Sequence, residues 1–321
     1  MRGGYLAALD ALLARGTRGL GSGFVARQVA FVTARQQPDG GFPGRWGPSD
    51  PYYTDFAIRV LALLAPTHPA LARAAAYLED LEDTPAGVVE CFSRLNAARL
   101  LRGCGIAVSA PVPGARECAL AALETRPPGA YEAFLAALCL EMVETPRGRG
   151  TLPARIIRAL WPGAGGGPVA RAARVVAEGQ APEGGFAARP GDGEAQTNAT
   201  AAAVALLLIG RCLRRGAARA AARFLASLQA PDGGLRAHAA AVGGALLSTI
   251  TGLLTLHGLG AARAVDLTAV ARFVRSAACA TGGFAASAVE SEPDLEYTYY
   301  GLGTMALLRV LAEGQRRPPG R

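Results

Sequence analysis

A short glycine turn recurs along the chain, and its spacing constrains the fold more than any other feature. Three copies read Gln-x-Pro-Asp/Glu-Gly-Gly-Phe/Leu, at 36–42, 180–186 and 229–235, and a fourth at 281–284 keeps only Thr-Gly-Gly-Phe. The first glycines stand at 40, 184, 233 and 282, so two intervals are 49 residues and the third is 144, or three times 48. Two degenerate copies must lie between, and Gly87 and Gly129 stand near the expected places. The spacing therefore predicts six repeat units.

Each unit contains two helices of different character. An alanine-rich helix with an arginine-bearing face ends at the glycine turn, and a loop leads to a second helix that is apolar on nearly every face. Helices that are apolar all round need covering, which a closed ring provides and an open solenoid does not. The chain is therefore predicted to be all-α, an (α/α)6 toroid. The expected second helices are 53–64, 89–101, 131–143, 200–210, 247–256 and 297–311.

We predict one domain over residues 1–321. The stretch 145–168 is rich in arginine and glycine and is interpreted as an insertion with an extra or broken helix at 152–161, and 314–321 as a tail. The six repeats are placed roughly at 18–64, 70–101, 115–143, 168–210, 216–257 and 266–313.

Composition excludes several classes of protein. The net charge is +8, but the basic residues are arginines scattered at the ends of helices, which is typical of a solvated shell, so no nucleic-acid partner is expected. No apolar run reaches the ~20 residues that span a bilayer. The first 17 residues carry Asp10 within their apolar stretch and lack a secretory cleavage site, so we expect a cytoplasmic protein.

The cysteines and histidines do not suggest a metal centre. The six cysteines form no C-x-x-C pair, and the three histidines have no second histidine at ligand spacing. We therefore expect reduced thiols, no metal ligands and no cofactor.

The turns resemble a known family. Gln36-x-x-x-Gly40-x-Phe42 and its copies are similar to the Q-x-x-x-G-x-W repeat of terpene cyclases and to the G-G-F repeat of protein prenyltransferase β subunits. The likeness covers roughly Val25 to Glu313, and the six units of about 49 residues match the prenyltransferases. The resemblance implies the toroid fold, whereas activity depends on residues between the repeats.

The resemblance also shows where this chain departs from the prenyltransferases. The family's zinc ligands, an aspartate and a cysteine in D-x-C and a histidine in D-x-x-H-T, fall on Gly244, Leu246 and Tyr297. The family's diphosphate-binding histidine falls on Gln196, and its arginine and lysine fall on His238 and Ala241. Zinc-dependent prenyl transfer is therefore expected to be lost.

The terpene cyclases supply a second comparison. Their D-x-D-D proton donor is approached only by Asp80-Leu-Glu-Asp83, which ends an outer helix and is interpreted as a solvated acidic patch. Cyclases also line their cavity with aromatic rings, and the 20 aromatic residues of this chain are sparse for that purpose.

Ring closure would bring the first and sixth units together, and these two carry the most polar starts of second helices. Crowded carboxylates raise one another's pKa, and a nearby tyrosine can relay a proton. The alternative is structural: Asp50 and Asp294 cap their helices, and Thr54 and Thr298 bond to the preceding turn. The catalytic candidates are Asp50, Asp55, Asp294, Glu296 and Tyr297, and the adjacent ligand-binding candidates are Tyr52, Tyr53, Tyr299 and Tyr300.

Further residues stand near the expected cavity. Cys91 has no histidine beside it in sequence and is interpreted as a buried structural thiol, and Trp46 is expected to plug the end of the barrel. His238 is either a solvent-exposed bystander or a base. The additional ligand-binding candidates are Glu90, Glu132, Gln196 and His238.

The sequence thus indicates a prenyltransferase β-subunit-like toroid that binds an isoprenoid or other hydrophobic ligand in a central cavity. If it is an enzyme, it is a transferase or cyclase that uses carboxylates rather than zinc. The alternatives are a non-catalytic scaffold that binds a protein partner, a conventional geranylgeranyltransferase-type β subunit, and a class II terpene cyclase. An enzyme should keep its polar rim around an open cavity, whereas a scaffold can fill that cavity.

Overall fold

The computed structural model describes residues 4–81, 84–108, 112–144, 166–287 and 289–316. Within these ranges the chain forms thirteen α-helices, one short 3-10 helix, η1 (Ala262–Ala264), and isolated β-bridges but no strand. None of the described helices is both long and apolar enough to cross a bilayer. The insertion expected at 145–168 and its helix at 152–161 fall almost entirely outside the described residues, and Pro168 begins a helix.

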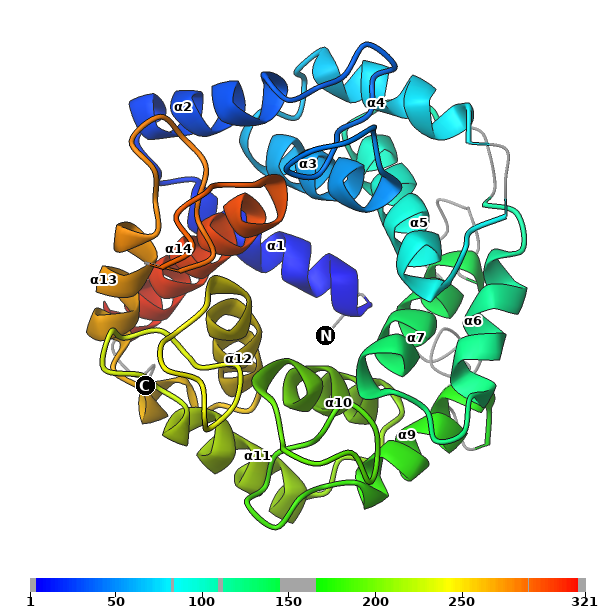
Figure 1. Cartoon of the computed structure of the whole chain (residues 1–321), viewed down its shortest axis with the longest axis vertical. Coiled ribbons are helices and arrows are strands. Elements are labelled where there is room, and N and C mark those ends of the chain that lie inside the picture. The colour runs from blue at the N-terminus through cyan, green and yellow to red at the C-terminus, as the bar shows by residue number, and fades with distance from the viewer. Residues whose placement is uncertain (1–3, 82–83, 109–111, 145–165, 288, 317–321) are drawn as a thin grey trace.

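Six hairpins form two concentric rings, as the repeat arithmetic predicts (Figure 1). The outer helices are α2 (Ser22–Thr33), α4 (Ala70–Glu79), α6 (Ala115–Glu124), α9 (Pro168–Glu178), α11 (Arg215–Ser227) and α13 (Leu267–Ser276). The inner helices are α3 (Pro51–Leu64), α5 (Val88–Gly103), α7 (Ala130–Glu144), α10 (Thr197–Ile209), α12 (Leu246–Gly258) and α14 (Leu295–Arg316). The predicted all-α toroid is confirmed. We call the end of the ring where the inner helices begin the mouth, and the end where they finish the floor.

The repeated glutamine joins each turn to the next unit. Gln36 Nε2 donates to the carbonyl oxygen of Gly40 in its own turn and to that of Ala70 on α4, each at 2.8 Å. Gln180 and Gln229 make the same pair of bonds, the latter reaching Asp266 at the start of α13. The motif is therefore a joint between neighbouring hairpins.

The sixth turn, which lacks this glutamine, closes the ring. The N–H of Gly283 donates to Oε1 of Gln28 on α2, at 2.8 Å, so a side chain of the first unit supplies the missing partner. Gly282 has a φ of +104° and lies so close to α2 that a Cβ there would stand 2.5 Å from the carbonyl oxygen of Arg27. Units six and one therefore pack as the other neighbours do.

One of the described helices lies outside the repeat pattern. Helix α1 (Tyr5–Thr17) crosses the centre of the ring (Figure 1). Its Tyr5 ring meets Phe134 on α7 edge to face at 5.3 Å, and a Cβ at Gly16 would collide with the backbone of Ala306 on α14. Leucines of α1 belong to all three hydrophobic clusters of the described residues. This helix closes the barrel from the floor.

Candidate functional site

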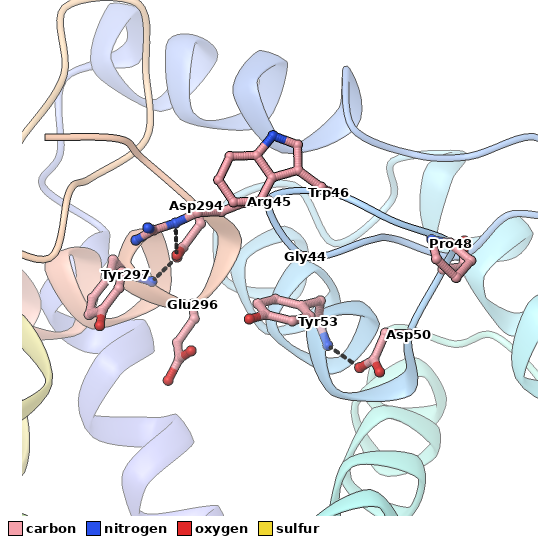
Figure 2. A pocket seen from close by; sticks show the side chains of 10 residues that line it. Gly44, Arg45, Trp46, Pro48, Asp50, Tyr53, Asp294, Glu296 and Tyr297 are labelled. Carbon is pink, nitrogen blue, oxygen red and sulfur yellow. Dashed lines mark hydrogen bonds and ion pairs between the residues drawn. The ribbon is translucent and has the colours of Figure 1, made fainter. Parts of the chain in front are cut away.

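A pocket of about 500 Å³ opens at the mouth, between the starts of α3 and α14. Figure 2 shows Glu296 between Tyr53 and Tyr297, with Trp46 above them. The first and sixth units are thus neighbours, as ring closure predicts, and they share one site. The lining residues are Gly44, Arg45, Trp46, Pro48, Ser49, Asp50, Tyr53, Asp294, Glu296 and Tyr297.

Two of the acids cap the helices that they precede. Oδ1 of Asp50 accepts from the backbone N–H groups of Tyr52 and Tyr53, at 2.7 and 3.3 Å. Oδ1 of Asp294 accepts from the N–H of Tyr297 at 2.8 Å. Capping occupies one oxygen of each carboxylate, so both aspartates have a structural role while they line the pocket.

Arg45 holds the second oxygen of Asp294. Its Nε lies 3.2 Å from Oδ2 of Asp294, and its Nη1 lies 2.5 Å from Oε1 of Glu290. Burial raises the pKa of Asp294, an effect that the Tyr297 N–H and the Arg45 charge oppose. The guanidinium is thereby already engaged by two carboxylates.

Glu296 links the mouth pocket to the barrel interior. Its Oε1 accepts from the hydroxyls of Tyr52 on α3 and Tyr300 on its own helix, at 2.8 and 2.9 Å. No described residue donates to its Oε2. Burial raises the pKa of Glu296 despite these two phenolic donors, so the neutral acid is favoured more than in a solvated glutamate.

Aromatic rings gather below Glu296. Phe56 contacts Tyr52, Tyr299 and Tyr300 with ring centroids 5.0 to 5.8 Å apart. Aromatic residues are few in this chain, but seven of its eight tyrosines lie at the mouth or within the barrel. These are Tyr5, Tyr52, Tyr53, Tyr131, Tyr297, Tyr299 and Tyr300.

Asp55 does not belong to the rim, although the sequence placed it there. It is fully buried, forms an ion pair with Arg59 one helical turn later, and accepts from Asn96 Nδ2 of α5 at 2.7 Å. The Arg59 guanidinium stands over the rings of Phe56, Phe92 and Tyr299, 4.6 to 5.4 Å from their centroids. The physical reason is helical geometry: five residues past the Asp50 cap, the side chain faces α5 rather than the mouth.

The remaining ligand-binding candidates lie away from the pocket. Glu90 accepts from the Ala86 N–H at 2.9 Å, Glu132 lies 3.7 Å from Arg189, and Gln196 is exposed at the start of α10. His238 is part-exposed and its Nδ1 lies 3.1 Å from Glu194. Each of these residues is engaged locally or faces solvent, and none of them lines the pocket.

Two single-residue expectations can also be compared with the structure. Cys91 is buried, as predicted, and its Sγ lies 3.6 Å from the carbonyl oxygen of Ala115. Trp46 does not plug the barrel: its side chain is 77% exposed and stands over the pocket. Trp46 is followed by Gly47, whose φ of +100° is a conformation that favours glycine.

The positions that correspond to the family's zinc ligands offer no suitable donor set. Leu246 is buried in the core, and Tyr297 lines the pocket. Among the residues that the structure describes, no group of three or more His, Cys, Asp or Glu could hold a metal ion. We therefore derive no chemistry through zinc.

Sequence reasoning missed three contributors to this region. Arg45, Arg59 and Tyr5 reach it from a loop, from the third turn of α3 and from a helix outside the repeats. The only signal was the placement of Arg59 in an otherwise apolar inner helix, since a charge there requires a buried partner.

Comparison with known proteins supports the fold. Residues 168–318 match the family model of the prenyltransferase alpha-alpha toroid domain. No curated protein matches the sequence. The type II terpene cyclase MstE from Scytonema is similar in structure, with a TM-score of 0.57, 14% identity, and coverage of 91% of this chain and 98% of that one. The predicted likeness to the toroid superfamily is confirmed.

Two further structures show how widely the architecture is used. A variant of MstE in complex with geranylgeranyl dihydroxybenzoate has a TM-score of 0.58, 13% identity, and coverage of 96% and 99%. A wild-type glycosidase has a TM-score of 0.55, 16% identity, and coverage of 90% and 98%. At these identities the likeness concerns the fold alone, and one fold serves both activities.

Proposed function

We propose that this protein binds an isoprenoid or similar apolar chain at the mouth of the toroid and transfers a proton to it through Glu296. The observation that carries the proposal is the position of this carboxyl group, at the boundary between an open pocket and a cluster of aromatic rings. Its Oε1 is fixed by two phenols and its Oε2 is unoccupied by any described donor. A carboxylic acid held in this way is oriented for donation.

The environment supports proton transfer to a double bond. Burial favours the protonated form of Glu296, and the rings of Trp46, Tyr53 and Tyr297 line the same pocket, where aromatic rings stabilise positive charge. The proton adds to one carbon of the double bond, the positive charge passes to the chain, and a neighbouring carbon then loses a proton to water in the open pocket, which restores neutrality. The carboxylate then regains a proton from solvent, so the product is an isomer of the substrate.

The pocket also fits ligand binding better than a purely structural role. Its volume of about 500 Å³ lies within the roughly 300–1,000 Å³ of ordinary small-molecule sites. It differs from the central apolar cavity that the sequence suggested, because it lies at the mouth and carries three carboxylates. A scaffold protein has no need to keep such a pocket open.

Isotope incorporation tests the proposal. We expect purified full-length protein incubated with geranylgeraniol in D2O to give an isomeric product with one added mass unit, and Glu296→Gln to give none. Glu292→Gln, which removes an exposed carboxylate on the loop just before α14, is the matched control and should retain the full yield. Bound geranylgeraniol with no deuterium in any product, or equal yields from wild type and Glu296→Gln, contradicts the proposed proton transfer.

A further inference from the structure

The hydrogen-bonding groups of the mouth pocket are unbalanced. Capping uses Oδ1 of Asp50, but no described residue donates to Oδ2 of Asp50 or to the phenol oxygens of Tyr53 and Tyr297. The pocket therefore has hydrogen-bond acceptors that no described residue satisfies.

The charged donor is committed, and the other free donors are neutral, namely the phenol O–H groups of Tyr53 and Tyr297 and the indole N–H of Trp46. Among the described residues that line the pocket, Arg45 is the one cationic side chain, and its guanidinium is shared between Glu290 and Asp294. A ligand that brings its own N–H donors can satisfy the free acceptors, whereas an anion meets the carboxylates of Asp50 and Asp294.

Three aromatic rings complete the lining. Figure 2 shows Tyr53 and Tyr297 on either side of Glu296, with Trp46 above. Trp46 exposes 77% of its surface, which is a large apolar area to leave in water without a ligand. Aromatic faces beside carboxylates are the surroundings that an organic cation prefers.

The charge of the whole mouth agrees with that of the pocket. The loops and first turns that form it, 36–50, 84–90, 125–132, 179–196, 228–245 and 277–296, hold twelve acidic residues and four arginines. The mouth therefore has a formal net charge of −8 in a chain of net charge +8, and its field attracts cations and repels a diphosphate.

From this pocket chemistry we infer that the mouth binds an ammonium or guanidinium group, so that the ligand is an apolar chain with a cationic end. Asp50 accepts its hydrogen bonds, Trp46, Tyr53 and Tyr297 enclose its charge, and Glu296 keeps the proton that the proposed function assigns to it. The inference rests on the proposed function for the apolar chain and adds the chemistry of the polar end.

Four small probes test the inference on the full-length protein: n-octylamine, n-octanol, octyl phosphate and n-butylamine, titrated calorimetrically. Octylamine should bind about tenfold or more tightly than octanol, because a charge-assisted hydrogen bond is lost with the alcohol, and octyl phosphate should bind weakest. Asp50→Asn and Trp46→Ala should each reduce the preference for the amine. Asparagine caps a helix as well as aspartate, so the first variant keeps the fold.

The controls separate this inference from the proposed function. Glu183→Gln, an exposed mouth carboxylate outside the pocket, should leave all four affinities unchanged. Equal affinity for octylamine and octanol, tighter binding of octyl phosphate, or no binding of any probe overturns the cationic end. Equal affinity for octylamine and butylamine supports the cationic end but removes the apolar chain and with it the proposed function.

Discussion

The mouth and the floor of the barrel are built by the same six hairpins but are finished in different ways. At the mouth, loops of unequal sequence leave a pocket between α3 and α14. At the floor, helix α1 crosses the ring, with Asp10 ion-paired to Arg99 on α5 and Arg15 to Glu313 on α14. The contrast indicates that repetition supplies a scaffold, and that non-repeated segments decide which end is accessible.

The contrast predicts that buried groups between the two ends tolerate change far less than those at the mouth. We expect Asp55→Asn to lower the free energy of unfolding by about 3–5 kcal/mol, because it leaves Arg59 without its counter-charge inside the barrel. Asp50→Asn, the same change at the mouth, should cost little because asparagine also caps helices. Urea unfolding of both variants makes the comparison, and equal stabilities would refute the distinction.

The floor helix is expected to contribute substantially to stability. Leu13 on α1 is 2% exposed, and Leu13→Ala should cost about 2–5 kcal/mol through lost burial and the cavity left behind. Leu208→Ala, at a leucine 47% exposed on α10, is the control and should cost much less. Thermal unfolding distinguishes the two, and a small effect at Leu13 would mean that α1 is a loosely held appendage.

The pH dependence of stability should also arise partly at the floor. Burial raises the pKa of Glu141 to about 7, and this residue lies against Gly4 just before α1. The folded state therefore holds a proton that the unfolded state releases near pH 4.5, so this contribution is complete below that pH and is lost as the pH rises to about 7. We expect Glu141→Gln to reduce the decline in the free energy of unfolding across this pH range by about 1–3 kcal/mol. Denaturant titrations at pH 4.5, 6 and 8 measure it, and an unchanged slope in the variant assigns the decline to other groups.

The repeat pattern predicted much of the site because the number of repeat units determines which units become neighbours when the ring closes. Once six units close, Tyr52 and Glu296 become neighbours although 244 residues separate them, and their hydroxyl and carboxylate are 2.8 Å apart. The pattern could not predict α1. Its apolar residues are compatible with any buried surface, and no second copy shows where it packs.

The direction in which side chains point was the other feature that the sequence could not predict. Asp55 and Glu296 both follow a capping aspartate on an inner helix, but one is five positions after its cap and the other two. That difference turns Asp55 toward α5 and leaves Glu296 at the pocket. Arg45 was overlooked because a loop residue gains its partners, Glu290 and Asp294, only after closure.

The bond from Gly283 to Gln28 also has a consequence for how such a protein can change in size. An additional hairpin inserted between the fourth and fifth units could keep the ordinary glutamine contact on both of its sides. An additional hairpin between the last unit and the first would separate Gln28 from the only described turn that depends on it. The bond between Gly283 and Gln28 therefore fixes where the ring starts. Evolution can add or remove whole hairpins most easily at positions away from this bond.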